Sequence, residues 1–161
     1  MNILEYAINM EIDAEKYYTK QAEINRNNSL YVVCSMLAKD ENNHARILKN
    51  RLGNLPYELT DSDMQLNIKN VFKDIDNFKS EIKKIPSQLD FYRMVLEKEK
   101  ESIDLYTDFL SKAIDEPEKT LFSYLIKQET KHYEIIYELV LMLRHTEDWV
   151  ESAEFGIRGE Y

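Results

Sequence analysis

Apolar residues recur every three or four positions along most of this chain, and that spacing predicts amphipathic α-helices. Four long segments carry the pattern, at residues 2–26, 30–52, 87–114 and 117–145. Only a few residues join the first segment to the second and the third to the fourth, so each pair is expected to form an antiparallel hairpin. The pattern therefore predicts an all-α protein whose four helices pack as a bundle.

The link between the second and third segments is far longer than a bundle turn. It spans residues 53–86, which is enough chain to cross the length of the bundle. Ser62-Asp63-Met64-Gln65 reads as a capping box, and apolar residues follow at helical spacing: Val71, Phe72, Ile75, Phe78 and Ile82. We expect an accessory helix within this crossover, with Pro86 just outside the start of the third bundle helix.

The last residues differ from the bundle segments. Residues 147–161 are acidic and aromatic and show no clear period. We therefore divide the chain into a bundle at residues 1–146 and a C-terminal tail at 147–161. The sequence leaves open whether the tail docks on the bundle, contacts a partner subunit or stays loose.

Composition narrows the possible partners. The chain has 161 residues, which suits one domain, and its three Gly and three Pro favour long helices. A net charge of −9 argues against nucleic acid or an anionic membrane as a partner. Cys34 is the single cysteine, so an internal disulfide is excluded, and we expect it to be a buried, inert thiol. Without a signal peptide or a spanning apolar run, a reducing cytoplasm is the expected location.

Two E-x-x-H motifs lie within the helical segments. In a helix this spacing turns the carboxylate and the imidazole to the same face. Each motif is preceded, 30 residues earlier, by another glutamate on an apolar face, and the two sets are offset by 88 residues. The first set is Glu11 with Glu41 and His44, and the second is Glu99 with Glu129 and His132.

Four carboxylates and two imidazoles on four helices form the ligand set of a dinuclear metal site. We expect Glu41 and Glu129 to bridge two metals, with Glu11 and Glu99 as terminal ligands and one histidine on each metal. Two divalent cations would balance the four negative charges. Iron is the expected metal and manganese is possible, because both favour oxygen ligands with some imidazole. The alternative, chance surface pairs, fits poorly with glutamates inside apolar stripes. His145 has no glutamate three residues before it and is expected at the surface.

Two tyrosines repeat with the same offset as the ligands. Tyr18 and Tyr106 each follow a terminal glutamate by seven residues, about two helical turns. Their hydroxyls are placed to reach a ligand carboxylate on a neighbouring helix. The alternative is an ordinary core tyrosine, whose buried hydroxyl still needs a partner. No catalytic residue beyond the metal ligands is identified from the sequence.

Taken together, these motifs resemble the rubrerythrin branch of the ferritin-like superfamily. The likeness covers most of residues 2–145 and rests on Met10-Glu11 through Tyr17-Tyr18 with Glu41-x-x-His44, and on Glu99 through Leu105-Tyr106 with Glu129-x-x-His132. The resemblance implies a ferritin-like four-helix bundle, a non-haem di-iron site, reaction with hydrogen peroxide or oxygen, and commonly a homodimer.

The chain also departs from that family's pattern. Rubrerythrins of the familiar type carry a rubredoxin domain with two C-x-x-C pairs, which Cys34 alone cannot form, so electrons are expected from an external donor protein. They also have an additional Glu one turn after the third-helix ligand. Here Ser102 stands at that position and Ala14 at its counterpart. The remaining ligand set is similar to bacterioferritin, and manganese catalases use a related one.

Three functions remain open on the sequence. The leading one is a di-iron oxidoreductase that reduces hydrogen peroxide or oxygen and is re-reduced by its donor. The second is a ferroxidase or iron-handling protein. The third is a metal-free helical module that binds a partner.

Overall fold

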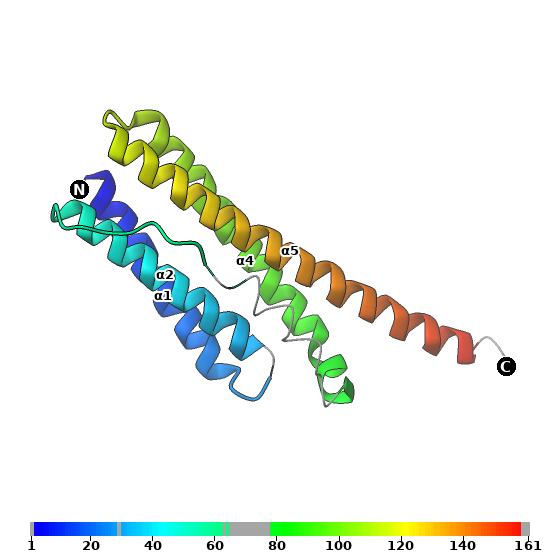
Figure 1. Cartoon of the computed structure of the whole chain (residues 1–161). Coiled ribbons are helices and arrows are strands. Elements are labelled where there is room, and N and C mark those ends of the chain that lie inside the picture. Colours follow the sequence, from blue (N-terminus) through cyan, green and yellow to red (C-terminus); the bar gives the residue numbers. More distant parts are fainter. Residues whose placement is uncertain (1, 29, 63, 65–77, 159–161) are drawn as a thin grey trace.

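Four helices account for almost all of the chain that the structure describes. The computed structural model describes residues 2–28, 30–62, 64 and 78–158, with the backbone alone for 78–87 and 146–158. The helices are α1 (Ile3–Ile24), α2 (Leu30–Leu52), α4 (Phe78–Lys112) and α5 (Glu116–Arg158). In Figure 1, α1 and α2 form one antiparallel hairpin and α4 and α5 form another beside it. The prediction of an all-α bundle of two hairpins is confirmed, and no strand occurs among these residues.

Short polar side chains fix where the helices begin. Asn2 caps α1, because its side chain accepts from the Glu5 backbone N–H at 2.8 Å and Glu5 accepts from the Asn2 N–H at 3.3 Å. Asn28 accepts from the Leu30 N–H at 2.9 Å where α2 begins. Asp115 accepts from the Glu118 N–H at 2.8 Å where α5 begins. These contacts satisfy backbone donors that have no partner within the first helical turn.

Two predicted helix boundaries were wrong. Helix α4 begins at Phe78 rather than at Ser87 and passes through Pro86, because a proline removes one backbone hydrogen bond without ending every helix that contains it. The apolar spacing at Phe78 and Ile82 therefore belongs to α4. The rest of the predicted accessory helix lies outside the described residues.

Helix α5 continues past the predicted end at His145 and reaches Arg158. Residues 146–155 contain neither Gly nor Pro, so nothing local stops the helix there. The backbone therefore shows no break at residue 146. The role of residues 147–161 as a separate tail stays a prediction.

The apolar core is divided into two clusters along the bundle. One cluster includes Leu37, Tyr92 and Ile136, and the other includes Ile8 and Phe122. Backbones approach most closely within each hairpin, whereas the two hairpins face each other at a greater separation. That separation leaves room for long side chains between the hairpins, in the band that lies between the two clusters.

The first part of the crossover lies along α2 and α5. Tyr124 donates to the Thr60 carbonyl, and the Gln128 amide and the Lys131 ammonium each lie 3.1 Å from Asp61 Oδ1. Ser62 donates to Asp40 on α2. These contacts hold the crossover across the α2–α5 side of the bundle.

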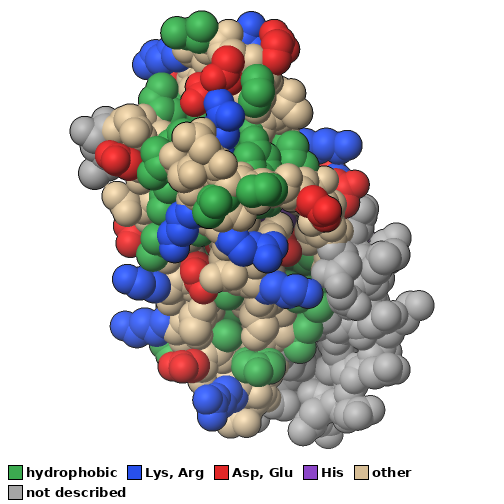
Figure 2. Space-filling model, turned by 60° about the vertical axis from the view of Figure 1, so that its left-hand side comes forward, with side chains coloured by type: hydrophobic (Ala, Val, Ile, Leu, Met, Phe, Trp, Pro, Cys, Tyr) green, Lys and Arg blue, Asp and Glu red, His purple; other side chains and the backbone are tan. Residues whose placement is uncertain are grey.

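The surface is charged but mixed in sign. Figure 2 shows one face on which Lys and Arg side chains alternate with Asp and Glu among apolar ones. Within the described part of the chain, none of the helices is long and apolar enough to cross a membrane. The single thiol is buried as expected, and burial raises the pKa of Cys34 to about 12.

Candidate metal centre

Six predicted ligands meet between the two hairpins. They come from all four helices, because each helix turns one apolar stripe inward and the ligands lie within those stripes. Every one of them is 3% exposed or less: Glu11, Glu41, His44, Glu99, Glu129 and His132. His145, by contrast, is exposed. The helices thus bury four carboxylates and two imidazoles in the band between the two apolar clusters.

The six residues form two overlapping groups. Glu11, Glu41, His44 and Glu129 offer ligand atoms that all lie within 4.8 Å of one another, and so do Glu41, Glu99, Glu129 and His132. Glu41 and Glu129 belong to both groups. The geometry provides two adjacent positions for a cation, with one carboxylate from each hairpin shared between them.

Both imidazoles turn Nδ1 toward the shared carboxylates. His44 Nδ1 lies 3.2 Å from Glu129 Oε1 and 3.8 Å from Glu41 Oε1. His132 Nδ1 lies 3.3 Å from Glu41 Oε1 and 3.4 Å from Glu129 Oε2. Each histidine therefore faces the E-x-x-H glutamate of the opposite hairpin as well as its own. This convergence is what a pair of bridged cations requires.

Several atoms of the cluster lack a hydrogen-bond partner. A buried polar atom left unpaired costs roughly 1–3 kcal/mol, so a group of them in one place calls for a ligand. The unpaired atoms are Glu11 Oε2, Glu41 Oε1, His44 Nδ1, Glu99 Oε2, both Glu129 oxygens and His132 Nδ1. Oxygen and imidazole donors around two sites fit two divalent cations, whose charge would balance that of the four carboxylates.

Electrostatics within the cluster favour added positive charge. Burial raises the pKa of Glu41 and of Glu99 well above the usual range, and neighbouring carboxylates raise both further. Burial alone would lower the pKa of His44, but the close carboxylates of Glu11 and Glu129 raise it to about 10. Glu41, Glu99 and His44 thus hold protons tightly, as crowded buried groups do. Glu129 differs, because burial would raise its pKa but its contacts with Glu99, His132 and His44 lower it well below the usual range.

Two tyrosines link the hairpins through the terminal carboxylates. Tyr18 on α1 donates to Glu99 Oε1 on α4 at 3.1 Å, and Tyr106 on α4 donates to Glu11 Oε1 on α1. Both hydroxyls are buried, and burial followed by the nearby carboxylate charge raises both pKa values well above 10. Each tyrosine therefore fixes one oxygen of a glutamate and leaves the other oxygen facing the cluster.

Asp40 contacts the nitrogen of His132 that faces away from the cluster, and the sequence analysis did not identify this residue. Its Oδ2 lies 2.8 Å from His132 Nε2 and also accepts from Ser62. Burial would raise the pKa of Asp40, but the contacts with His132 and Ser62 lower it. An ionised Asp40 accepts a hydrogen bond from Nε2–H, which keeps the proton on that nitrogen and leaves the Nδ1 lone pair for a metal. The sequence signal that could have indicated this role is the position of Asp40 immediately before Glu41.

Comparison with known proteins agrees with this geometry. The family model described as Rubrerythrin matches residues 2–140, which is most of the chain. The chain belongs to the rubrerythrin family. Neither the curated proteins nor the solved structures compared with it give a match. Membership and the buried cluster together indicate a metal-binding bundle of the rubrerythrin type.

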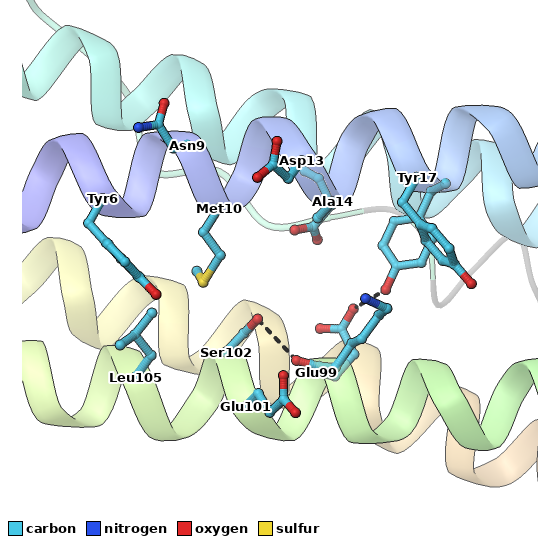
Figure 3. A pocket seen from close by; sticks show the side chains of 13 residues that line it. Tyr6, Asn9, Met10, Asp13, Ala14, Tyr17, Glu99, Glu101, Ser102 and Leu105 are labelled. Carbon is cyan, nitrogen blue, oxygen red and sulfur yellow. Dashed lines mark hydrogen bonds between the residues drawn. The ribbon is translucent and has the colours of Figure 1, made fainter.

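The rubrerythrin-family bundle also carries a cleft that leads to its centre. The cleft has a volume of about 580 Å³ and lies between α1 and α4 (Figure 3). Its inner lining includes Tyr18, Glu41 and Glu99, so it reaches the cluster itself. Ser102, at the position where the sequence departs from the rubrerythrin pattern, and its repeat equivalent Ala14 lie in the walls of the cleft.

Proposed function

We propose that the protein is a di-iron oxidoreductase that reduces hydrogen peroxide or oxygen and is re-reduced by an external electron-donor protein. The observation that carries the proposal is the pair of overlapping ligand groups, buried between the hairpins of a rubrerythrin-family chain. Glu41 and Glu129 would bridge the two irons, and Glu11 and Glu99 would each bind one. His44 and His132 complete the two sets. Manganese fits the same donors.

Bound iron would supply the two electrons that reduction of hydrogen peroxide to water consumes. The chain's own residues hold the geometry for that chemistry. Tyr18 and Tyr106 fix the terminal carboxylates, and Asp40 fixes the ring of His132. The two apolar clusters exclude water along the bundle axis, and the cleft between α1 and α4 admits small reactants. Residues in such rigid positions can bind and orient without rearranging.

Metal analysis of natively purified protein tests the centre. We expect two iron ions per chain, with an optical spectrum typical of a dinuclear ferric centre after oxidation. Protein loaded with ferrous iron without oxygen should then be mixed rapidly with hydrogen peroxide or with oxygen. We expect faster oxidation by hydrogen peroxide. Comparable rates with the two oxidants, together with turnover of many irons per centre, would contradict a peroxidase function. A natively purified protein free of iron and manganese would contradict the proposal as a whole.

A ferroxidase is the second candidate, and Ser102 is the observation that favours it. The additional glutamate of the rubrerythrin pattern is missing there, and the six remaining ligands are similar to those of bacterioferritin. Oxidation of many ferrous ions per centre, with release of each product ion, would favour this function over the reductase.

The oligomeric state, the location and the electron donor are also part of the proposal. We propose a homodimer in the cytoplasm whose electron donor is a separate protein, since Cys34 alone cannot hold a rubredoxin-type iron. Sedimentation of the full chain tests the dimer. Re-reduction of the oxidised centre by an added rubredoxin tests the donor.

A further inference from the structure

The two sides of the metal centre are built differently. On the α2–α5 side the crossover lies across the bundle, held by Thr60, Asp61 and Ser62. On the α1–α4 side the described residues leave the cleft of about 580 Å³ open (Figure 3). A molecule therefore reaches the centre between α1 and α4.

The cleft is far larger than hydrogen peroxide or oxygen. A water molecule takes about 30 Å³ in the liquid, and a diatomic or peroxide molecule is little bigger. Cavities of roughly 300–1,000 Å³ hold organic molecules of many atoms. A second hollow of about 280 Å³ shares Tyr6 and Leu105 with the cleft and extends it toward Ile3 and Phe109. The space therefore suits a reactant with an organic body.

The cleft has several apolar side chains in its walls and carboxylates at its floor. Figure 3 shows Met10, Ala14 and Tyr17 of α1 across the opening from Ser102 and Leu105 of α4. At the floor, Glu41 Oε1 and Glu99 Oε2 are buried without a hydrogen-bond partner. A molecule with a small polar group at one end and an apolar body matches this arrangement.

Small side chains at two facing positions keep the cleft open. Ala14 on α1 has only a methyl group, and the Ser102 hydroxyl turns back to donate to the Lys98 carbonyl at 3.1 Å. Neither side chain reaches across to the opposite helix. A longer residue at either position would narrow the path to the floor.

Charge at the mouth selects against anions. Asp13 and Glu101 are exposed at the rim, with Lys98 as the one cation among the lining residues that the structure describes. Two acidic groups against one basic group give a negative rim, which repels carboxylates and leaves neutral molecules unaffected. The cleft is therefore suited to neutral compounds.

We propose that this cleft binds compact, neutral organic hydroperoxides and that the centre reduces them, an inference that rests on the proposed function. The O–O bond breaks, two electrons come from the reduced metal pair, and two protons come from solvent. The hydroperoxide ROOH leaves as the alcohol ROH and one water. The external donor protein returns the two electrons.

Binding is tested on full-length protein loaded with zinc, which cannot transfer electrons. The probe is 2-phenyl-2-propanol, the alcohol formed from cumene hydroperoxide. Titration should shift the ¹³C-methyl signals of Met10 and Ala14, and benzoate, an anion of similar size, should bind more weakly. Ser102→Phe should weaken binding of the alcohol by about tenfold or more, because the ring fills the cleft.

Ser111→Phe is the matched control, since it is the same change at an exposed position on the opposite face of α4. Ala14→Leu narrows the cleft from the facing wall and serves as the second variant if Ser102→Phe does not fold. Absence of binding to the unsubstituted chain overturns the inference. Equal binding to a folded cleft variant does so too.

Turnover of the iron-loaded protein completes the test. The unsubstituted chain should reduce both hydrogen peroxide and cumene hydroperoxide, and Ser102→Phe should lower the rate ratio of cumene hydroperoxide to hydrogen peroxide by about tenfold. Reduction of hydrogen peroxide but not of cumene hydroperoxide overturns this inference and leaves the proposed function intact. Reduction of neither compound overturns both.

Discussion

The two hairpins present the same predicted ligand residues in different surroundings. Their glutamates, histidines and tyrosines repeat at an offset of 88 residues, yet the residue before each E-x-x-H glutamate differs. In the first hairpin it is Asp40, which contacts His132 of the second. In the second it is Gln128, whose amide donates to Asp61 of the crossover instead. The ligand set is thus nearly symmetric, while the support behind the two histidines is not.

That difference follows from the crossover, which breaks the symmetry of the bundle. Its described first part, residues 53–62, lies along α2 and α5, where Ser62 contacts Asp40 and Asp61 contacts Gln128. No second connection covers α1 and α4 among the described residues, where the cleft opens. The crossover thus covers the α2–α5 side of the two hairpins, while the described residues leave the α1–α4 side open. The two candidate metal positions differ as a result.

The largest expected effect concerns the ligands that both groups share. Glu41→Ala and Glu129→Ala should each lose both metals, because each carboxylate contributes to both groups. Glu11→Ala and Glu99→Ala should each weaken one position only. Metal content per chain after gel filtration measures this, with the exposed Glu134→Ala as the control. Two tightly bound metals in either shared-ligand variant would disprove the bridging roles.

Metal removal should weaken the contact between the hairpins. Cations that bind only the folded bundle stabilise it by mass action, by about 4 kcal/mol at a thousandfold excess over the dissociation constant. For a chain of this size that shifts the melting temperature on the order of 10 °C. Thermal melts with and without a chelator measure the shift. An unchanged midpoint would mean that the buried glutamates hold no cation.

Asp40 and Gln128 allow the asymmetry to be tested directly. Asp40→Ala should lower the metal affinity of the His132 position by roughly 10–100-fold, as loss of a carboxylate behind a ligand histidine does. Gln128→Ala should leave both affinities close to those of the parent, because its amide contacts the crossover. Titration of metal-free protein with manganese resolves the two positions. Equal losses of metal affinity in Asp40→Ala and Gln128→Ala would contradict the proposed difference in support behind the two histidines.

The smallest expected effect concerns Ser102 and the preference of the metal centre for hydrogen peroxide over oxygen. In Ser102→Glu the new carboxylate lies one turn from Glu99 on the same helix face. We expect it to raise the ratio of the peroxide rate to the oxygen rate, because it restores the glutamate of the rubrerythrin pattern. Stopped-flow oxidation with each oxidant measures the ratio, and Ser102→Gln controls for size. An unchanged ratio would place the selectivity elsewhere in the centre.

The sequence alone predicted the six candidate ligands, because their recognition depends on local geometry. Positions three apart lie on one helix face whatever the rest of the chain does, so Glu41 with His44 and Glu129 with His132 follow from spacing. The short links determined the hairpins in the same way. The helix ends were predicted less well. A proline disfavours a helix without always ending it, as at Pro86, and residues 146–155 contain no Gly or Pro that would stop one.

Only the tertiary structure decided how the helices meet. Tyr18 reaches Glu99, Tyr106 reaches Glu11, and Asp40 reaches His132, across 81, 95 and 92 residues of sequence. Those contacts depend on the depth and rotation at which two hairpins pack, which no local spacing encodes. The same holds for the cleft, which lies where the hairpins stand apart and where none of the described crossover residues covers α1 and α4. Helix periodicity fixes which side chains point inward, and packing fixes what they touch.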